Sequence, residues 1–349
     1  MKNYIHLEYI WLDGNEPQQI RSKTKIVEKL ESRGDLFESY KSNPGLLSVW
    51  NFDGSSTNQA ETSKSELLIK PINVFIDPFK NNGILVLCEV YNPDGTAHST
   101  NKRLDLVDIV NQKDSETLFG WEQEYFLFDT QTEKPIGWPK IGYPKPQGDF
   151  YCANGASRVE GREFVEKHAI LCQEAGLQIS GINAEVALGQ WEYQIGPVSA
   201  IDGSDQLWIS RFILERLSES YGWYVELSPK PYKGNEWNGS GMHVNFSTKE
   251  MRENLANKKD LVIKACQKLG EKIEEHISVY GSGNEFRLTG QNETCSINQF
   301  RWGIGDRTAS IRIPSSIEDG STPGYLEDRR PASNACPYQV AKVMIETIC

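Results

Sequence analysis

The segment "NAEVALGQWEYQIGP" (residues 183–197) places two glutamates, Glu185 and Glu192, in an otherwise mostly apolar stretch. A carboxylate buried without a partner either costs considerable free energy or takes up a proton. A partner is therefore expected close by, and it could be water, an arginine or a metal ion. The rest of the chain narrows this choice.

Alternation within this segment is typical of a β-strand with one apolar and one polar face. Trp191, Tyr193 and Ile195 share one face, and Glu192 lies on the other with its flanking glutamines. A single glutamate on such a strand is more often solvated than functional, so Glu192 alone would carry little weight.

Length and composition exclude several classes of protein. At 349 residues the chain has room for about two domains, and its formal charge of -11 without a Lys/Arg block argues against nucleic-acid binding. The apolar run "GILVLCEVY" (83–91) is too short to span a bilayer, and Glu8 and Asp13 interrupt any signal peptide. The cysteines, seven in number with no C-x-x-C pair, indicate reduced thiols and a cytoplasmic protein.

The chain changes character after about residue 100. The first hundred residues contain strand-like runs, such as residues 4–12 with one buried face, and a single short helical candidate near 24–31. The second part is α+β and includes a Gly/Pro/aromatic loop at 131–157. Apolar spacing there predicts helices at 103–110, 161–176, 204–220 and 257–278.

Two further strands repeat the arrangement of polar groups on one face. In "GWEQEYFLFD" (120–129), Glu122 and Glu124 point the same way and share that face with Phe126 and Phe128. In "GMHVNFS", the polar face holds His243, Asn245 and Ser247, opposite Met242, Val244 and Phe246.

The acids of these segments are too many to share a cleft without cations, because like charges raise one another's pKa. The set consists of Glu122, Glu124, Glu185, Glu192 and Glu327, with His243 as the one imidazole. Oxygen ligands with a single imidazole suit Mg²⁺ or Mn²⁺ rather than zinc. Such ions serve phosphate chemistry, although the chain has no P-loop motif.

Positive charge for phosphate is expected from "GDRTASIRIP" (305–314) and "YLEDRRP" (325–331). Arg312 lies between two isoleucines and should point into a polar cleft, where guanidinium binds phosphate or carboxylate bidentately. Arg330 is interpreted as a surface salt-bridge residue. Arg287 precedes a polar, Gly-containing segment suited to a flap, and Asp53 in "FDGSST" is, on spacing alone, a turn residue.

Seven segments in the same order resemble glutamine synthetase, the shorter type found in eukaryotes and some bacteria. They are "WNFDGSST", "GWEQEYFLFD", "NAEVALGQWEYQIGP", "WNGSGMHVNFST", "RLTGQNET", "DRTASIRIP" and "GYLEDRRP". The resemblance implies an N-terminal β-grasp domain (1–98). It implies next a glutamine synthetase/guanido kinase-type catalytic domain (99–349), with a curved antiparallel sheet flanked by helices. It also implies a homo-oligomer of stacked rings, a decamer of two pentamers, with each site completed by the neighbouring subunit.

By motif position, the resemblance also implies a role for each site residue. Two or three Mg²⁺ or Mn²⁺ ions per site would be held by Glu124, Glu185 and Glu192 and by Glu122, His243 and Glu327. ATP would be bound by Glu192, Asn245, Ser247, Arg307, Arg312 and Tyr325. Glutamate would be bound by Trp237, Asn238, Gly239, His243, Arg287 and Arg329. The catalytic residues would be Asp53, Glu293, Arg307 and Arg312, with Asp53 reaching ammonium from the next subunit.

The implied reaction is ATP-dependent ligation of ammonia to the γ-carboxylate of L-glutamate, through γ-glutamyl phosphate. Three alternatives keep much of the same scaffold: a γ-glutamyl ligase for another amine such as a polyamine, a guanidino kinase, and a catalytically silent structural ring homologue. The two acids Asp53 and Glu293 favour ammonium. A silent homologue predicts lost ligands, whereas every metal-ligand and arginine position is filled here.

Overall fold

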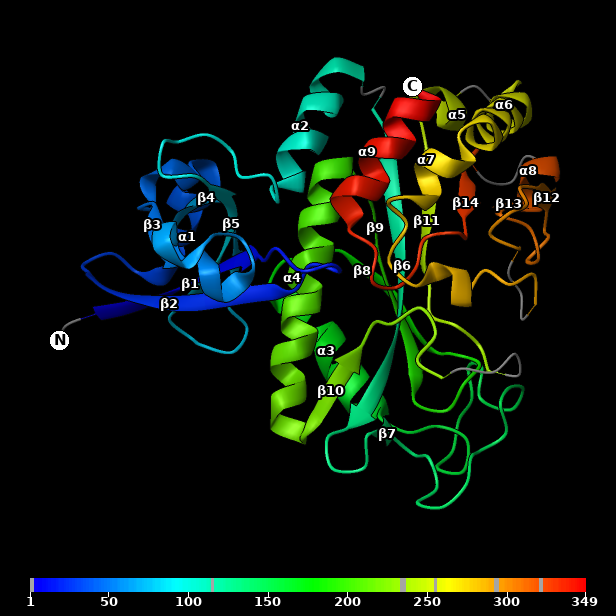
Figure 1. The fold of residues 1–349 in the computed structure, drawn as a ribbon, viewed down its shortest axis with the longest axis horizontal. Helices are drawn as coiled ribbons and strands as arrows, with labels where there is room; N and C mark the ends of the chain where they lie inside the picture. Colours follow the sequence, from blue (N-terminus) through cyan, green and yellow to red (C-terminus); the bar gives the residue numbers. More distant parts are fainter. Residues whose placement is uncertain (1–2, 114–115, 233–236, 254–255, 292–294, 320–322) are drawn as a thin grey trace.

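The computed structural model of the chain describes residues 3–113, 116–232, 237–253, 256–291, 295–319 and 323–349. Within these residues the strands form a five-stranded sheet and a nine-stranded sheet. In Figure 1 the first sheet lies on one side of the long helix α4 (Ala200–Ser218), and strands of the second sheet lie on the other.

The first sheet has the strand order β2-β1-β5-β4-β3, with a parallel pair β1·β5 between antiparallel partners. Its strands are β1 (Asn3–Leu12), β2 (Ile20–Lys29), β3 (Trp50–Asp53), β4 (Glu66–Ile76) and β5 (Gly83–Tyr91). One face packs on helix α1 (Arg33–Ser42), through a core that includes Leu36 and Tyr40. The chain thus begins with a β-grasp domain, as expected.

One expectation for this sheet was wrong and another was confirmed only in part. The segment 24–31, expected to be helical, largely belongs to strand β2, which pairs with β1 over ten residue positions. Strand β1 buries Ile5, Leu7, Tyr9 and Trp11 on one face as predicted. It is not half-buried over its whole length, because its second face also packs near its end: Ile10 is 1% exposed and belongs to the main core of the molecule. Leu85 and Leu87 of β5 join that core too, which explains why β5 is apolar on both faces.

The second sheet has the order β12-β13-β14-β11-β6-β9-β8, with β7 and β10 also paired to β6. Its strands are β6 (Leu118–Asp129), β7 (Lys134–Pro135), β8 (Ile179–Ala184), β9 (Gln190–Val198), β10 (Trp223–Glu226), β11 (Met242–Ser247), β12 (Trp302–Ile304), β13 (Ile311–Ile313) and β14 (Leu326–Asp328). Its pairs are antiparallel apart from β12·β13.

Helices cover the apolar face of this sheet. Besides α4 they are α2 (Lys102–Lys113), α3 (Arg162–Glu174), α5 (Lys249–Glu253), α6 (Lys258–Glu271), α7 (Ile273–Ile277), α8 (Ser316–Asp319) and α9 (Pro337–Ile348), whereas α1 packs on the first sheet. Side chains of α2, α3, α4, α6 and α9 form one core with the apolar residues of β6, β9 and β11. The opposite, polar face of the three strands is therefore left for the site.

The helix predictions were mostly confirmed. Helices α2, α3 and α4 lie where the apolar spacing predicted them, within a few residues at each end. The single helix expected at 257–278 is instead two, α6 and α7, because the backbone leaves helical geometry at Lys272 (φ -122°, ψ 31°). Helices α1 and α9 were not predicted.

A buried ion network joins the two sheets. Asp205 of α4 is fully buried and accepts hydrogen bonds from Arg103 Nε at 2.7 Å and Tyr338 Oη at 2.9 Å. It also accepts one from Asn73 Nδ2 of β4 at 3.0 Å, and Arg103 Nη1 reaches Glu89 of β5 at 2.9 Å. One carboxylate of the second part of the chain therefore holds two strands of the first.

Candidate active site

Strands β6, β9 and β11 separate apolar from polar side chains as predicted. Trp121, Tyr193 and Val244 belong to the main core, whereas Glu122, Glu192 and His243 lie on the opposite face and line a cavity of about 270 Å³. Side chains alternate between the two faces of a strand. Once the three strands pair side by side, their polar residues therefore lie together on one face of the sheet.

This cavity gathers twelve of the residues predicted for the site: Glu122, Glu124, Glu185, Glu192, Asn238, Gly239, His243, Arg287, Arg307, Arg312, Glu327 and Arg329. Glu327 comes from β14, which pairs with β11, and Arg312 comes from β13, which pairs with β14. Segments more than two hundred residues apart in the sequence thus share one polar cavity.

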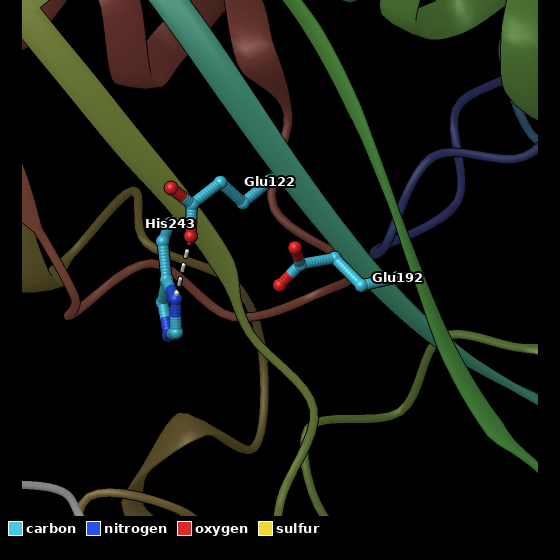
Figure 2. A group of neighbouring side chains, drawn as sticks. All are labelled: Glu122, Glu192 and His243. Atoms are coloured by element: carbon cyan, nitrogen blue, oxygen red, sulfur yellow. Dashed lines mark ion pairs between the residues drawn. The ribbon is translucent and has the colours of Figure 1, made fainter. Parts of the chain in front are cut away.

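Two groups of carboxylates and imidazole have the spacing of a metal site. The ligand atoms of Glu124, Glu185 and Glu192 lie within 4.8 Å of one another, as do those of Glu122, Glu192 and His243. Figure 2 shows the second group, with the Glu122 carboxylate facing the His243 ring and Glu192 directed into the same space. Glu192 belongs to both groups, so the two lie side by side.

Neutral neighbours hold these carboxylates in place. The Gly241 N–H donates to Glu124 Oε2 at 2.6 Å, and Asn245 Nδ2 donates to Glu122 Oε1 at 2.7 Å. Asn183 Nδ2 donates to Glu185 Oε1 at 3.0 Å. A side chain at Gly241 would come within 2.4 Å of Arg287 Nη2, which explains the glycine there.

Burial and mutual repulsion raise the pKa values of these carboxyl groups. Burial raises the pKa of Glu124 to about 7. Burial, and then the charge of Glu124, raise the pKa of Glu185 to about 8. Burial, followed by the charges of Glu122, Glu185 and Glu124, raises the pKa of Glu192 to about 9. A divalent cation would remove the cause of these shifts, because it replaces the missing solvation and offsets the repulsion.

His243 is a neutral imidazole in this setting. Burial, followed by the charge of Arg329, holds its pKa well below the ordinary histidine value. Its Nδ1 lies 3.4 Å from Glu122 Oε2 and 3.5 Å from Glu327 Oε1, and Arg287 Nη2 lies 3.0 Å from its Nε2. A neutral imidazole among carboxylate oxygens is the form that binds a metal.

Arginines also line the cavity, next to the carboxylates. Arg312 Nη1 donates to Glu327 Oε2 at 3.1 Å, and Arg329 also donates to that carboxylate. The Nε atoms of Arg312 and Arg329 are buried without a hydrogen-bond partner among the described residues. Both guanidinium groups therefore have donor capacity left for an anion.

A second cavity of about 400 Å³ lies beside the first and shares Glu122 and Gln194 with it. Its walls are mostly apolar, including Ile195, Pro197 and Phe246. Asn245, Ser247 and Tyr325, predicted to seat a nucleotide, all line it. An apolar slot opening onto a charged cavity has the shape and polarity that a nucleoside triphosphate requires.

Two predicted site residues line neither cavity. Asp53 caps the short helix Gly54–Thr57 of the first sheet, where it is exposed and accepts from Ser55 and Ser56. Trp237 is buried against Trp138 and does not line the first cavity. Glu293 lies outside the described residues.

The interpretation of Arg330 as a surface salt-bridge residue was wrong. Arg330 is 3% exposed and pairs with the fully buried Asp328, to which its Nε donates at 2.9 Å. Asp328 also accepts from Tyr280 Oη at 2.7 Å. The pair fixes the turn that carries Arg329 into the cavity.

Several residues of the site were not predicted. Tyr151 lines the first cavity, and the Arg307 guanidinium lies 6.0 Å from its ring, yet it belongs to a loop without a recognisable pattern. Gln190 Nε2 donates to the Gly239 carbonyl at 2.9 Å, and Gln194 Nε2 to Glu192 at 2.9 Å. Their position on the same strand face as Glu192 is the signal that could have identified them.

The donor set fits a hard divalent cation. It consists of buried carboxylates with one neutral imidazole and no thiolate, and its acids are driven towards protonation in the absence of positive charge. Oxygen-rich sites of this kind suit Mg²⁺ or Mn²⁺.

The fold and the site together indicate a two-domain enzyme, in which a β-grasp sheet is followed by a larger sheet with a polar cavity on one face. The family model "Glutamine synthetase, beta-Grasp domain" matches residues 3–93, and "Glutamine synthetase, catalytic domain" matches residues 102–349. The chain therefore belongs to the glutamine synthetase family.

Individual glutamine synthetases are similar to the chain over nearly its whole length. A glutamine synthetase of Tuber borchii is 47% identical over 352 residues, covering 100% of this chain and 93% of the relative. One of Streptomyces viridochromogenes is 47% identical over 348 residues, covering 98% and 96%. A solved structure described as "Apo GmaS without ligand" superposes with a TM-score of 0.73 at 18% identity, over 97% of this chain and 76% of that one. That last likeness concerns the fold alone.

Among the described residues, every helix is too short or too polar to cross a membrane.

Proposed function

We propose that the chain is a glutamate–ammonia ligase, which forms L-glutamine from L-glutamate, ammonium and ATP through γ-glutamyl phosphate. The observation that carries the proposal is the cavity in which carboxylates and a neutral imidazole face arginines, beside an apolar slot. Full-length identity to glutamine synthetases supports the same reaction.

Each part of the site has a role in this proposal. Two or three Mg²⁺ or Mn²⁺ ions would be held by Glu124, Glu185 and Glu192 and by Glu122, His243 and Glu327, and would neutralise charge on the ATP phosphates. Glu192 also lies within ligand distance of Glu122 and His243, and Glu327 lies 3.5 Å from His243, so Glu192 would be close to both ions. Asn245, Ser247 and Tyr325 would seat the nucleoside. Glutamate would be bound by Trp237 through its neighbours Asn238 and Gly239, by Arg287 and Arg329 on its carboxylates, and by His243.

Two displacements complete the reaction. In the first, a γ-carboxylate oxygen of glutamate bonds to the γ-phosphorus of ATP, and the bond to the bridging oxygen breaks, releasing ADP. Arg307 and Arg312 stabilise the charge on the transferring group. In the second, ammonium gives a proton to a carboxylate, and the resulting ammonia attacks the acyl carbon. Phosphate leaves with the bonding electron pair, and the amide nitrogen loses a second proton.

Asp53 would receive the proton of ammonium in the site of a neighbouring subunit. Its place on the first sheet, exposed and outside the cavity of its own chain, supports a role in another copy. We therefore propose a homo-oligomer of stacked rings, a decamer of two pentamers, in which residues 1–98 of one subunit complete the site in residues 99–349 of the next. Glu293 would be the flap residue over the intermediate.

A cytoplasmic location completes the proposal. All seven cysteines are free in the structure, which supports a reducing compartment.

The decisive experiment is phosphate release from Mg-ATP with L-glutamate, with and without ammonium, alongside a Glu327→Ala variant. Release that requires both substrates, yields glutamine and is lost in the variant supports the ligase and the role of Glu327. Efficient replacement of ammonium by a polyamine would contradict the choice of amine. Tight nucleotide binding without turnover on any amine would instead indicate a structural ring homologue.

The stability of the metal-free protein should fall as pH rises, and bound metal should suppress this fall. The pKa values of Glu124, Glu185 and Glu192 in the folded, metal-free protein are about 7, 8 and 9, whereas 4.5 is the ordinary value. Above pH 4.5 the folded state therefore binds more protons than the unfolded state, so the stability of the metal-free protein falls as pH rises towards 9. Thermal unfolding at pH 6, 7, 8 and 9, with EDTA or with Mn²⁺, measures the effect.

We expect the difference in Tm between the Mn²⁺ and EDTA samples to grow from pH 6 to pH 9, because fewer protons then compete with the cation. A difference that is constant or shrinks over this range would contradict the assignment of the three carboxylates to a metal.

A further inference from the structure

A stack of aromatic rings lies behind the wall of the cavity, formed by Phe128, Trp138, Tyr232 and Trp237. We call it the Trp138 stack. The Trp138 ring centroid lies 4.4 Å from that of Tyr232 and 4.8 Å from that of Trp237, with interplanar angles of 31° and 30°. Phe128 of β6 stacks on Tyr232 at 6.0 Å. Stacked rings in such contact stabilise one another beyond their buried area.

Trp138 is firmly held at its own end. Its indole Nε1 donates to the Leu188 carbonyl at 2.8 Å, and its backbone N–H donates to the Pro135 carbonyl at 3.2 Å. Pro135 belongs to β7, which pairs with β6, and Trp138 is only 9% exposed. The ring is thus fixed to the sheet that carries Glu122 and Glu124, although it belongs to the loop 131–157.

Trp237, which contacts the Trp138 ring, is adjacent to the cavity wall. Trp237 directly precedes Asn238 and Gly239, which line the first cavity. Gly239 is tightly enclosed: a Cβ there would lie 2.7 Å from Arg287 Cγ and 2.7 Å from the Pro229 carbonyl oxygen. A displacement of Trp237 would therefore move the wall against Arg287.

The same wall is held by the carboxylate site on its far side. Gln190 Nε2 donates to the Gly239 carbonyl, and Glu124 accepts the Gly241 N–H. Residues 237–241 are thus clamped between the Trp138 stack at one end and the metal-site strands at the other. Small displacements of such a wall are costly, because substrate geometry must hold within a fraction of an ångström.

We propose that Trp138 is a positioning residue for the amino-acid subsite, acting through Trp237 on Asn238 and Gly239. Trp138 does not line the cavity. The inference rests on the proposed function, which assigns glutamate to this wall. The residues of the second cavity do not include any member of the stack, so nucleotide binding should be independent of it.

The test compares Trp138→Ala, Trp138→Phe and a matched control, Trp223→Ala. Trp223 is half-buried on β10, also paired to β6, and its ring partners are Phe164 and Tyr221 rather than the Trp138 stack. The readouts are KM for glutamate, KM for ATP and kcat. Calorimetric binding of L-glutamate to the Mg-ADP complex and Tm are measured beside them.

For Trp138→Ala we expect KM and Kd for glutamate to rise about tenfold, with KM for ATP changed less than about twofold, since the ring contacts with Tyr143, Tyr232 and Trp237 are lost. Trp138→Phe should restore glutamate affinity to within about threefold of the wild type, because a smaller ring still stacks. Trp223→Ala should lower Tm without altering glutamate affinity.

Equal changes in both KM values, unchanged glutamate affinity in Trp138→Ala, or the same glutamate defect in Trp223→Ala would overturn the positioning role. Failure of the proposed function looks different, because wild-type protein would then bind glutamate without turnover on ammonium, or not bind it at all. If the wild type binds glutamate without turnover, the calorimetric Kd values still test the role of Trp138. If the wild type does not bind glutamate at all, both the proposed function and the positioning role are contradicted.

Discussion

Glu192→Gln is expected to abolish most activity and, at the same time, to stabilise the metal-free protein at alkaline pH. Glu192 is the one carboxylate shared by both ligand groups, so glutamine removes a negative charge from each. Loss of such electrostatic stabilisation should lower kcat by about 10²–10³-fold. The shape of the side chain is retained, and its Oε1 can still accept the hydrogen bond from Gln194.

The gain in stability follows from the pKa of about 9 that burial and neighbouring acids impose on Glu192. Between pH 4.5 and 9 the folded state holds a proton that the unfolded state has lost, and ionising this group opposes folding increasingly as pH rises. Glutamine does not ionise. The Tm of metal-free Glu192→Gln should therefore exceed that of the wild type at pH 8 and approach it at pH 5.

Glu163→Gln is the matched control, because Glu163 lies exposed in the first turn of α3. It should leave kcat and the pH dependence of Tm as in the wild type. A Glu192→Gln variant that loses activity but is also less stable at pH 8 would show that Glu192 is a structural residue, satisfied without a cation.

Alternation along strands was the most reliable feature of the sequence, because it depends only on the period of the backbone. It correctly separated Glu122 from Trp121, Glu192 from Tyr193 and Arg312 from its flanking isoleucines. It also brought out the polar face before any contact between strands was known. The resemblance in motif order then indicated the family, which the full-length matches confirm.

The failures all depended on contacts between distant segments. The segment 24–31 has helix-forming residues, but pairing with β1 decides its structure. Helix α1 buries only Leu36 and Tyr40 and thus leaves little periodic signal, whereas α9 is apolar on nearly every side. Arg330 was interpreted as a surface residue because the charged segment "EDRR" contains no signal that Asp328, its partner, is fully buried.

Asp205→Ala is expected to lower the free energy of unfolding by about 3–5 kcal/mol, since removing one partner leaves a buried charge uncompensated. Arg103, whose side chain is 15% exposed, would keep only Glu89 as a carboxylate partner. Tyr338 and Asn73 would lose the acceptor described above. Urea unfolding followed by tryptophan fluorescence measures the loss, and Asp202→Ala, an exposed acid in the first turn of the same helix, is the control.

The double variant Arg103→Met/Asp205→Leu separates the charge network from simple packing. If the cost of Asp205→Ala comes from an orphaned guanidinium, the double variant should recover a large part of it, because apolar groups of similar size can replace a buried ion pair. A double variant as unstable as the sum of the single changes would contradict that account.

Strand β3, which carries Asp53, pairs with β4, where Asn73 contacts Asp205. This contact therefore links the strand beside Asp53 to helix α4, and in the proposed ring assembly it would help to present Asp53 to a neighbouring subunit. Asp205→Asn, which keeps the shape of the network, should raise KM for ammonium more than KM for ATP.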